Sequence, residues 1–441
     1  MSDKNRITEE LKNAICHQVE LKQNDIITVL QNMVRLPSVT HPPGGDEGKV
    51  QVYVEELFRS MGLEVDVFEP TQVAGLTEHE GYWSGLDYTG RPNVVGRWKG
   101  HGGGRTLILN GHCDVVPEGP RERWDDDPFS GTVKDGRLYG RGSVDMKGGI
   151  AAMTMAVDVL MSCGIKLKGD VILESVVNEE LGGYNGTLAC ILKGYHGDAA
   201  IVTEPSNMKI EPANKGGQAY RITVEGVGAH TSFWWDGVSA LDKAILIKKA
   251  IEDFSRIRYE QTRDNPLYSS PKIYPIPALT DCIYSFHAGD PSIMGVPNEA
   301  SMELMIDVLP GESLDEVKAA FEKAIMDAAQ KDPWLEEHPP RMEYADMREI
   351  YPTQIELDNP IIDSLKSAYM DVVKEDATIC GFESACDAMM FNMFSETPAL
   401  IFGPGQLSLA HRPNEYMDLK QLIEAVKILA ISIAEFCGVV D

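Results

Sequence analysis

The feature that most constrains the fold is a short apolar run that leads directly into a histidine and an aspartate. Residues 106–109 read Thr-Leu-Ile-Leu, and Asn-Gly-His-Cys-Asp follows at 110–114. A run this short predicts a buried strand. Alternate residues of a strand share a face, so His112 and Asp114 project together while Cys113 points the other way. An isolated pair of this kind is more often structural than metal-binding, so the rest of the chain decides its meaning.

Further segments deliver polar side chains where strands or turns end. Asp145 stands in a glycine-flanked segment where a helical pattern begins, and a β-rich run ends in Glu179 and Glu180. Another run precedes Glu204, and a glycine-rich turn leads to His411. Strands alternate with helical patterns, which predicts an α/β fold with a mainly parallel, three-layer sheet. The carboxyl ends of parallel strands carry the sites of such folds, so we expect these side chains to converge with the first histidine.

The pattern of the chain changes near residue 215 and divides it into two domains. A chain of 441 residues is too long for one ordinary core. Residues 215–352 show strand, helix, strand, strand, helix and strand, which is typical of an α+β unit of the split β-α-β kind. We predict that this unit is inserted into the first domain, which comprises residues 1–214 and 353–441. Residues 8–35 carry apolar residues at helical spacing and predict a helix.

The composition limits the classes of binding partner that we expect and indicates the cellular compartment. The 40 Lys and Arg against 68 Asp and Glu give a net charge of −28, and a surface this acidic repels nucleic acids. Residues 1–10 are polar and no apolar stretch approaches a membrane span, so we expect neither a secretory signal nor a membrane partner. The eight cysteines are scattered without paired spacing, as in reduced cytoplasmic proteins. We therefore expect a cytoplasmic protein.

The collected donors, two imidazoles and three carboxylates, suit two divalent metal ions. Zinc is the first choice, with cobalt or manganese as alternatives. Five side chains satisfy two ions only if one carboxylate bridges them, and Asp145 is the natural bridge because of its glycine-rich approach. Such a pair activates water near neutral pH and polarises a carbonyl, so we expect amide hydrolysis. Glu179 and Glu180 point opposite ways on an extended chain, so one is expected to be a ligand and the other the general base; an exposed acidic pair is the structural alternative.

Five motifs occur in order along the chain: GHCDVVP at 111–117, GRGSVDMKGG at 140–149, NEE at 178–180, TEPS at 203–206 and AHRPNE at 410–415. In these motifs the chain resembles the family that includes aminoacylase, acetylornithine deacetylase and succinyl-diaminopimelate desuccinylase. Members of that family are dinuclear zinc amidohydrolases and exopeptidases. The resemblance covers the chain from about the first helix to the last.

The resemblance implies a role for each residue of the site. Two metal ions would share one carboxylate, with His112, Asp145 and Glu204 as the ligands of the first and Asp145, Glu180 and His411 as those of the second. Glu179 matches the catalytic base, and Asp114 matches the carboxylate that lies behind His112.

The inserted domain resembles the family's lid, which commonly pairs two subunits, so a homodimer is implied. His230, in Gly-Ala-His, matches the lid histidine that reaches the site of a neighbouring subunit and stabilises the oxyanion. Asn298 matches a lid residue near the substrate carboxylate. Where many members carry an arginine just before the Leu-Pro-Gly-Glu segment, this chain has Asp307, so no arginine clamp on a carboxylate is expected there.

The leading hypothesis is a metal-dependent hydrolase that cleaves a linear amide bond and deacylates an N-acyl amino acid or a similar small N-acyl amine. A dipeptidase or carboxypeptidase of the same fold is the alternative, with a short peptide as substrate. A non-catalytic dimer that binds a ligand is a third reading. The presence of a base beside five ligands weighs against it, because a binding module has no need of a base.

Overall fold

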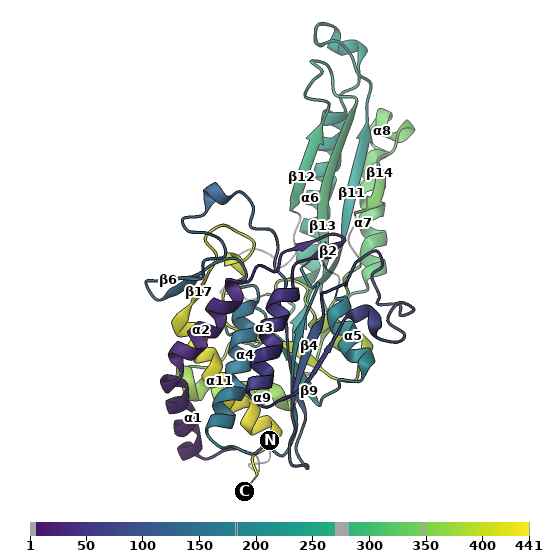
Figure 1. Ribbon diagram of the computed structural model, residues 1–441. Helices are drawn as coiled ribbons and strands as arrows, with labels where there is room; N and C mark the ends of the chain where they lie inside the picture. Colours follow the sequence, from purple (N-terminus) through teal and green to yellow (C-terminus); the bar gives the residue numbers. More distant parts are fainter. Residues whose placement is uncertain (1–5, 181, 183, 270–281, 346–348, 441) are drawn as a thin grey trace. The chain divides into compact units, whose positions relative to one another are not determined.

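The strand predicted at residues 106–109 lies inside a six-stranded sheet (Figure 1). The computed structural model describes residues 6–180, 182, 184–269, 282–345 and 349–440. The strands of this sheet are β3 (Glu64–Phe68), β4 (Asn93–Trp98), β5 (Leu107–His112), β8 (Val171–Val176), β9 (Ala199–Val202) and β16 (Ala399–Ile401). Their order is β16–β9–β5–β8–β4–β3, with parallel pairing from β16 to β8 and antiparallel pairing from β8 to β3. The predicted mainly parallel sheet is confirmed.

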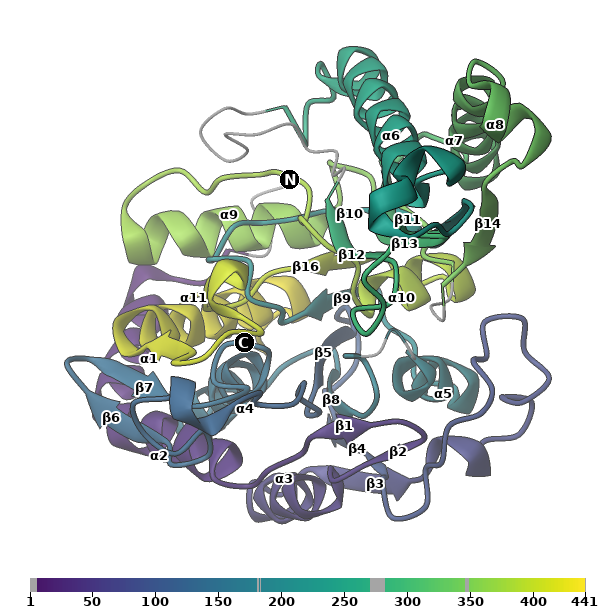
Figure 2. The same cartoon turned by 90° about the horizontal axis from the view of Figure 1, so that it is seen from above.

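Helices cover both faces of this sheet and complete the layers (Figure 2). They are α1 (Glu9–Leu21), α2 (Gln23–Val34), α3 (Gly48–Ser60), α4 (Lys147–Ser162), α5 (Asn185–Lys193), α9 (Pro360–Val373), α10 (Ala388–Phe394) and α11 (Leu419–Cys437). α4 and α11 lie on one face, and α5 and α10 lie on the other. α4 and α11 are buried along most of their length because α1, α2 and α9 pack against their outer sides.

The helix predicted over residues 8–35 is two helices, because the chain leaves helical geometry at Lys22. Its φ and ψ are −97° and 10°, and its N–H is shared between the carbonyls of Gln18 and Val19. No glycine or proline marks this break, so the spacing of apolar residues passes through it unchanged.

Short strands join the loops around the sheet. β6 and β7 form a hairpin that β17 extends, and β1 pairs with β2. β10 pairs with β15. Their bounds are β1 (Thr40–His41), β2 (Gly44–Gly45), β6 (Thr132–Lys134), β7 (Arg137–Tyr139), β10 (Ala213–Asn214), β15 (Thr353–Gln354) and β17 (Tyr416–Asp418).

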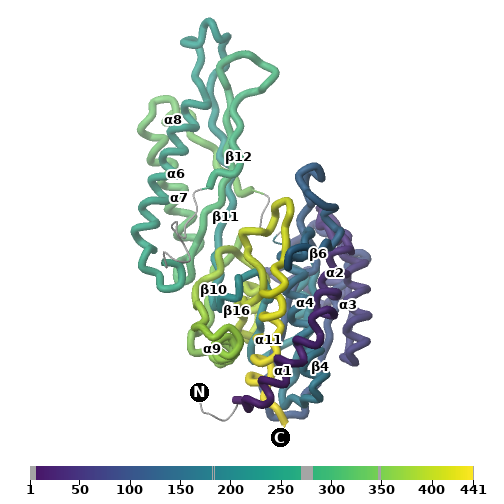
Figure 3. Tube along the Cα trace, turned by 90° about the vertical axis from the view of Figure 1, so that its left-hand side faces the viewer, coloured from purple at the N-terminus to yellow at the C-terminus, as the bar shows by residue number. Residues whose placement is uncertain are grey.

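A second unit holds a four-stranded antiparallel sheet in the order β12–β13–β11–β14, with helices packed on one face (Figure 3). Apolar residues alternate along β11 and β13, and Ile222 and Leu304 pack with Ile247 and Phe321 of the helices. This is the predicted α+β arrangement; residues 346–348, at the end of the last predicted strand, lie outside the described residues. The elements are β11 (Gly216–Glu225), α6 (Ala240–Thr262), β12 (Ile283–Ala288), β13 (Glu299–Val308), α7 (Leu314–Ala329), α8 (Pro333–Glu337) and β14 (Arg341–Tyr344).

The chain divides into two compact units. The first comprises Met1–Ala213, Gln354–Phe382 and Cys386–Asp441, and the second comprises Asn214–Thr353 and Glu383–Ala385. Residues 383–385 join the second unit although nothing in their sequence pattern sets them apart. Within the described parts of both units, every helix is too short or too polar to cross a membrane.

Candidate metal centre

Parallel strands β5, β8 and β9 end at the same edge of the sheet, and each delivers a candidate ligand there. His112 is the last residue of β5, Glu180 follows β8 and Glu204 follows β9. Asp145 lies two residues before α4, and His411 lies in the loop that leads to β17. Because the carboxyl ends of parallel strands face the same way, segments that are distant in sequence meet at this edge.

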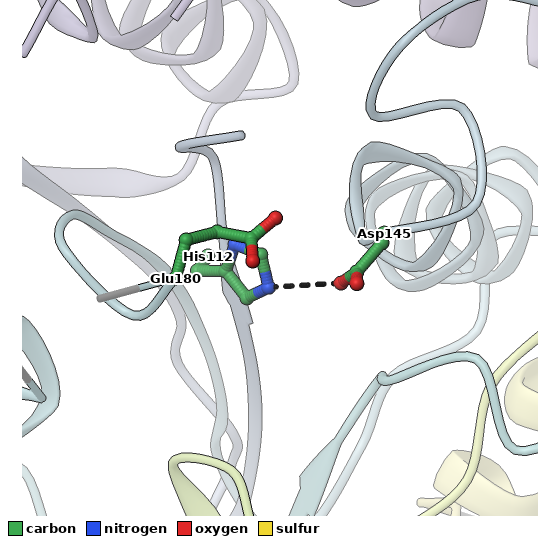
Figure 4. Close-up of side chains that lie close together, drawn as sticks. All are labelled: His112, Asp145 and Glu180. Atoms are coloured by element: carbon green, nitrogen blue, oxygen red, sulfur yellow. Dashed lines mark hydrogen bonds and ion pairs between the residues drawn. The ribbon is translucent and has the colours of Figure 1, made fainter. Parts of the chain in front are cut away.

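Asp145 lies between two histidines. Its Oδ1 is 3.2 Å from Nε2 of His112, and its Oδ2 is 3.2 Å from Nε2 of His411. Figure 4 shows His112, Asp145 and Glu180 turned toward a common space. Each carboxylate oxygen of Asp145 therefore faces a different imidazole, which is the arrangement that a bridging ligand requires.

The remaining carboxylates lie near the same two imidazoles. Oε2 of Glu180 is 2.9 Å from Nε2 of His411. Oε1 of Glu204 and Oε2 of Glu179 are 3.6 and 3.8 Å from Nε2 of His112. One ligand atom from each residue lies within 4.8 Å of the others in the trio His112, Asp145 and Glu180, and the same holds for His112, Glu179 and Glu204.

The ring of His112 is oriented by the residue two positions further along the chain. Its Nδ1 lies 3.0 Å from the main-chain carbonyl oxygen of Asp114, whereas the nearest carboxylate oxygen of Asp114 is 3.6 Å away. Nδ1–H donating to that carbonyl leaves Nε2, which points at Asp145, as the ring nitrogen available to a metal ion. His112 and Asp114 are both fully buried, so the orientation is held inside the protein.

The carboxylate of Asp114 holds the turn that carries the acidic pair. Its Oδ1 and Oδ2 accept the main-chain N–H groups of Glu179 and Glu180, at 3.2 and 3.1 Å. Asn178 before them adopts a left-handed φ of +69°, and its carbonyl accepts the N–H of Tyr184. With the main chain fixed in this way, the side chain of Glu180 turns toward His411 and that of Glu179 turns toward His112.

Sequence reasoning missed Glu415, a buried carboxylate that, like Asp114, accepts main-chain N–H groups at the site. Oε1 of Glu415 accepts the main-chain N–H groups of Val144 and Asp145, at 2.9 and 3.3 Å. Its Oε2 lies 2.6 Å from Nη1 of Arg141. Both residues belong to motifs that carry the family resemblance, GRGSVDMKGG and AHRPNE, and this was the signal available in the sequence.

Burial and crowding shift the ionisation of the site. Burial raises the pKa of Glu180 to about 7 and the pKa values of Glu179 and Glu204 well above the ordinary range. Burial opposes ionisation of Asp145 as well, yet hydrogen bonds with His112 and His411 hold its pKa below its usual value. Several buried carboxylates in one small space repel each other, and positive charge among them relieves that repulsion.

The donor set fits a pair of divalent ions of the zinc type. Imidazole nitrogens and carboxylate oxygens are the ligands that zinc, cobalt and manganese accept. The donors come from two histidines and several acids, and one carboxylate faces both imidazoles. Apart from His411, the donor side chains are at most 11% accessible. His411 is about half-exposed, with 54% of its side-chain surface accessible, so one side of the site is open to small molecules.

The two residues predicted on the inserted domain belong to the second unit. His230 precedes a short helical turn at Thr231–Asp236, and its Nδ1 accepts the N–H of Ser232 at 3.1 Å. Asn298 directly precedes β13 and lines a hollow of about 240 Å³. Asp307, which stands where an arginine is common in the family, is 2.8 Å from Nζ of Lys215.

Comparisons with known proteins agree with the chemistry that the residues of the site suggest. The model of the family described as Peptidase family M20/M25/M40 matches residues 108–435. A relative from Halalkalibacterium halodurans, N-formyl-4-amino-5-aminomethyl-2-methylpyrimidine deformylase, is 29% identical over 95% of this chain and 96% of its own. A probable succinyl-diaminopimelate desuccinylase from Staphylococcus epidermidis is 28% identical over 71% of this chain and 79% of its own.

Solved structures share the fold. Human carnosine dipeptidase 1 superposes with a TM-score of 0.73 at 16% identity, covering 97% of this chain and 99% of that one. A metallo-carboxypeptidase from Sulfolobus solfataricus superposes with a TM-score of 0.69 at 16% identity, covering 93% and 98%. At these identities the likeness concerns the fold.

Proposed function

Since the chain belongs to peptidase family M20/M25/M40 and is a hydrolase of that family, we propose that it removes an acyl group from an amino nitrogen of a small molecule. The site would hold two divalent ions, zinc by preference. Asp145 carries the proposal, because its two carboxylate oxygens each face a different histidine at 3.2 Å. Sites with two metal ions activate water and polarise a carbonyl, and amide hydrolysis needs both effects.

The proposed ligands of the first ion are His112, Asp145 and Glu204, and those of the second are Asp145, Glu180 and His411. When bound, two such ions polarise the scissile carbonyl and lower the pKa of an attacking water. The short contacts from Asp145 to both histidines and from Glu180 to His411 support this division.

Glu179 is the proposed general base. Its carboxylate reaches the space beside His112, while the adjacent Glu180 turns toward His411. Burial raises the pKa of Glu179, so the group can take a proton from water and return it to the leaving amine. The main-chain anchors on Asp114 keep the two side chains apart during this transfer.

Deacylation is favoured over peptide cleavage by the relatives that align along the chain. The deformylase matches nearly the whole of both chains, and the desuccinylase matches most of both. Both names describe removal of a small acyl group from nitrogen, and we carry that chemistry to this chain as N-deacylation. A dipeptidase or carboxypeptidase activity is the second candidate, and the peptidase structures support it only through the fold.

One panel of substrates decides between these activities. Formyl, acetyl, succinyl and carbamoyl amino acids, an N-formyl aminomethylpyrimidine and a set of dipeptides are assayed with zinc, cobalt or manganese. We expect kcat/KM to be highest for an N-acyl compound. A higher kcat/KM for dipeptides would assign the protein as a peptidase, and no turnover at two bound ions per chain would contradict both activities.

We also propose a cytoplasmic homodimer that pairs through the second unit, with His230 stabilising the oxyanion in the partner's site and Asn298 near the substrate carboxylate. The edge strand β12 supports pairing, because Tyr284 and Phe286 are exposed on it. Glu179→Gln and His230→Ala chains, each inactive alone, should regain activity when mixed, because each mixed dimer holds one intact site. Verified mixed dimers without activity would contradict the shared site.

A further inference from the structure

Arg141 and Glu415 form a buried ion pair beside the candidate metal centre. Nη1 of Arg141 lies 2.6 Å from Oε2 of Glu415, and the two residues are 2% and 1% exposed. A buried pair costs solvation free energy, which the remaining hydrogen bonds of both groups must offset. Glu415 has such bonds from two main-chain N–H groups, and Arg141 also reaches the carbonyl of Pro117 at 3.4 Å and lies over the ring of Trp124.

The pair joins the two loops that carry Asp145 and His411. Oε1 of Glu415 accepts the N–H of Asp145 itself, and the carbonyl of Glu415 accepts the N–H of Gly140 at 2.9 Å. Glu415 lies four residues after His411 in the same loop. The contact between Asp145 and His411 is therefore supported by a second link between their loops, made by the main chain and by Glu415.

The other candidate ligands are held differently. His112 belongs to β5, and Glu204 lies two residues after β9, so their main chains are fixed by the central sheet. His411 lies outside any helix or strand, and its φ of +59° is left-handed. The proposed ligand set of the second ion, which includes His411, thus depends more on loop contacts than that of the first ion, which includes His112 and Glu204.

We infer that Glu415, fixed by Arg141, is a positioning residue that holds Asp145 and His411 together and so sets the affinity of the ion that both would bind. The inference rests on the proposed function. It makes Glu415 the counterpart of Asp114, since each buried carboxylate accepts two successive main-chain N–H groups from a loop that carries ligands.

The test is a Co²⁺ titration of the metal-stripped full chain, followed by visible absorption and calorimetry. In Glu415→Gln the side-chain amide cannot accept both N–H groups and face Arg141 without placing two donors together. We expect the second equivalent of Co²⁺ to bind about 10–100-fold more weakly than in the wild type, with the first changed less than threefold. The absorption that develops with the second equivalent should change, because the ligand geometry changes.

Glu435→Gln is the matched control. Glu435 is also buried, at 4% exposed, but it belongs to α11, and its carboxylate faces Lys12, with Oε1 3.5 Å from Nζ. Both variants should lower Tm, whereas only Glu415→Gln should weaken the second equivalent. A lowered Tm with both affinities within twofold of the wild type, or with both weakened equally, would overturn the inference.

Arg141→Lys keeps the positive charge, and it tests the positioning role of Glu415 if Glu415→Gln does not fold. It loses the planar guanidinium fork that joins Glu415 to Pro117, so a smaller loss of the same kind is expected. An unchanged second affinity in this variant would also overturn the inference. If the wild type itself binds no Co²⁺, the proposed function fails, and that result is distinct from a defect confined to the variants.

Discussion

Nε2 of His411 lies 2.9 Å from Oε2 of Glu180, although 231 residues separate the two in the chain. Glu180 is anchored by its main chain after β8, whereas His411 comes from a half-exposed loop. Their contact is possible because the central sheet and the pairing of β17 with β7 bring the two segments to one edge. One half of the proposed centre thus depends on a long-range contact that a single substitution can remove.

His411→Ala should leave one bound ion per chain where the wild type binds two, because the second ion would lose its only imidazole. Turnover should fall together with the metal content. Elemental analysis after dialysis measures the metal content. His101→Ala serves as the control, because His101 is exposed in the loop before β5, whereas His112 is the last residue of that strand. Two retained ions in His411→Ala would remove His411 from the ligand set.

Glu179→Gln should keep the fold and both ions while kcat falls by about 10²–10⁴-fold, the usual contribution of a general base. Steady-state kinetics and metal analysis are made on the same preparation, with exposed Glu122→Gln as the control. A near-normal kcat would show that Glu179 is not the general base. Loss of an ion would instead make Glu179 a ligand, as the trio with His112 and Glu204 allows.

Asp114→Asn should reduce both stability and turnover. The amide nitrogen of asparagine cannot accept a hydrogen bond, so one buried N–H of Glu179 or Glu180 loses its partner, at a cost of about 1–3 kcal/mol. Asp170→Asn is the control, because Asp170 also accepts a main-chain N–H, that of Gly100, at the opposite end of β8. The control should lose stability, measured by denaturant unfolding, and keep its kcat. Equal kcat values in both variants would contradict the positioning of the acidic pair.

Stability of the metal-stripped protein should fall as the pH rises. Burial raises the pKa of Glu180 to about 7, whereas an unfolded glutamate ionises near 4.5. A group whose folded pKa is raised contributes stability that is present below the unfolded pKa and is lost as the pH rises through the folded one. Tm of the stripped protein should therefore fall between about pH 5 and pH 8, and bound metal should oppose this fall. Equal pH dependence of Tm with and without metal would contradict the assignment of this pH dependence to the carboxylates of the metal site.

The sequence alone predicts the sheet and much of the site because both follow from local patterns. A short apolar run ending in His-Cys-Asp identifies β5 and the shared face of His112 and Asp114. The break at Lys22 was missed because no residue type marks it. The hydrogen bonds of Asp114 and Glu415 were missed for another reason: side-chain spacing does not show which main-chain N–H groups a distant carboxylate accepts.

Asp145 is proposed to bridge two metal ions. The most direct measurement is an anomalous difference map from a crystal of the protein grown with zinc and recorded at the zinc absorption edge. If Asp145 bridges the two ions, the map should show two peaks about 3.5–4 Å apart, one on each side of the Asp145 carboxylate. No peak at this carboxylate, or peaks only elsewhere on the protein, would contradict it.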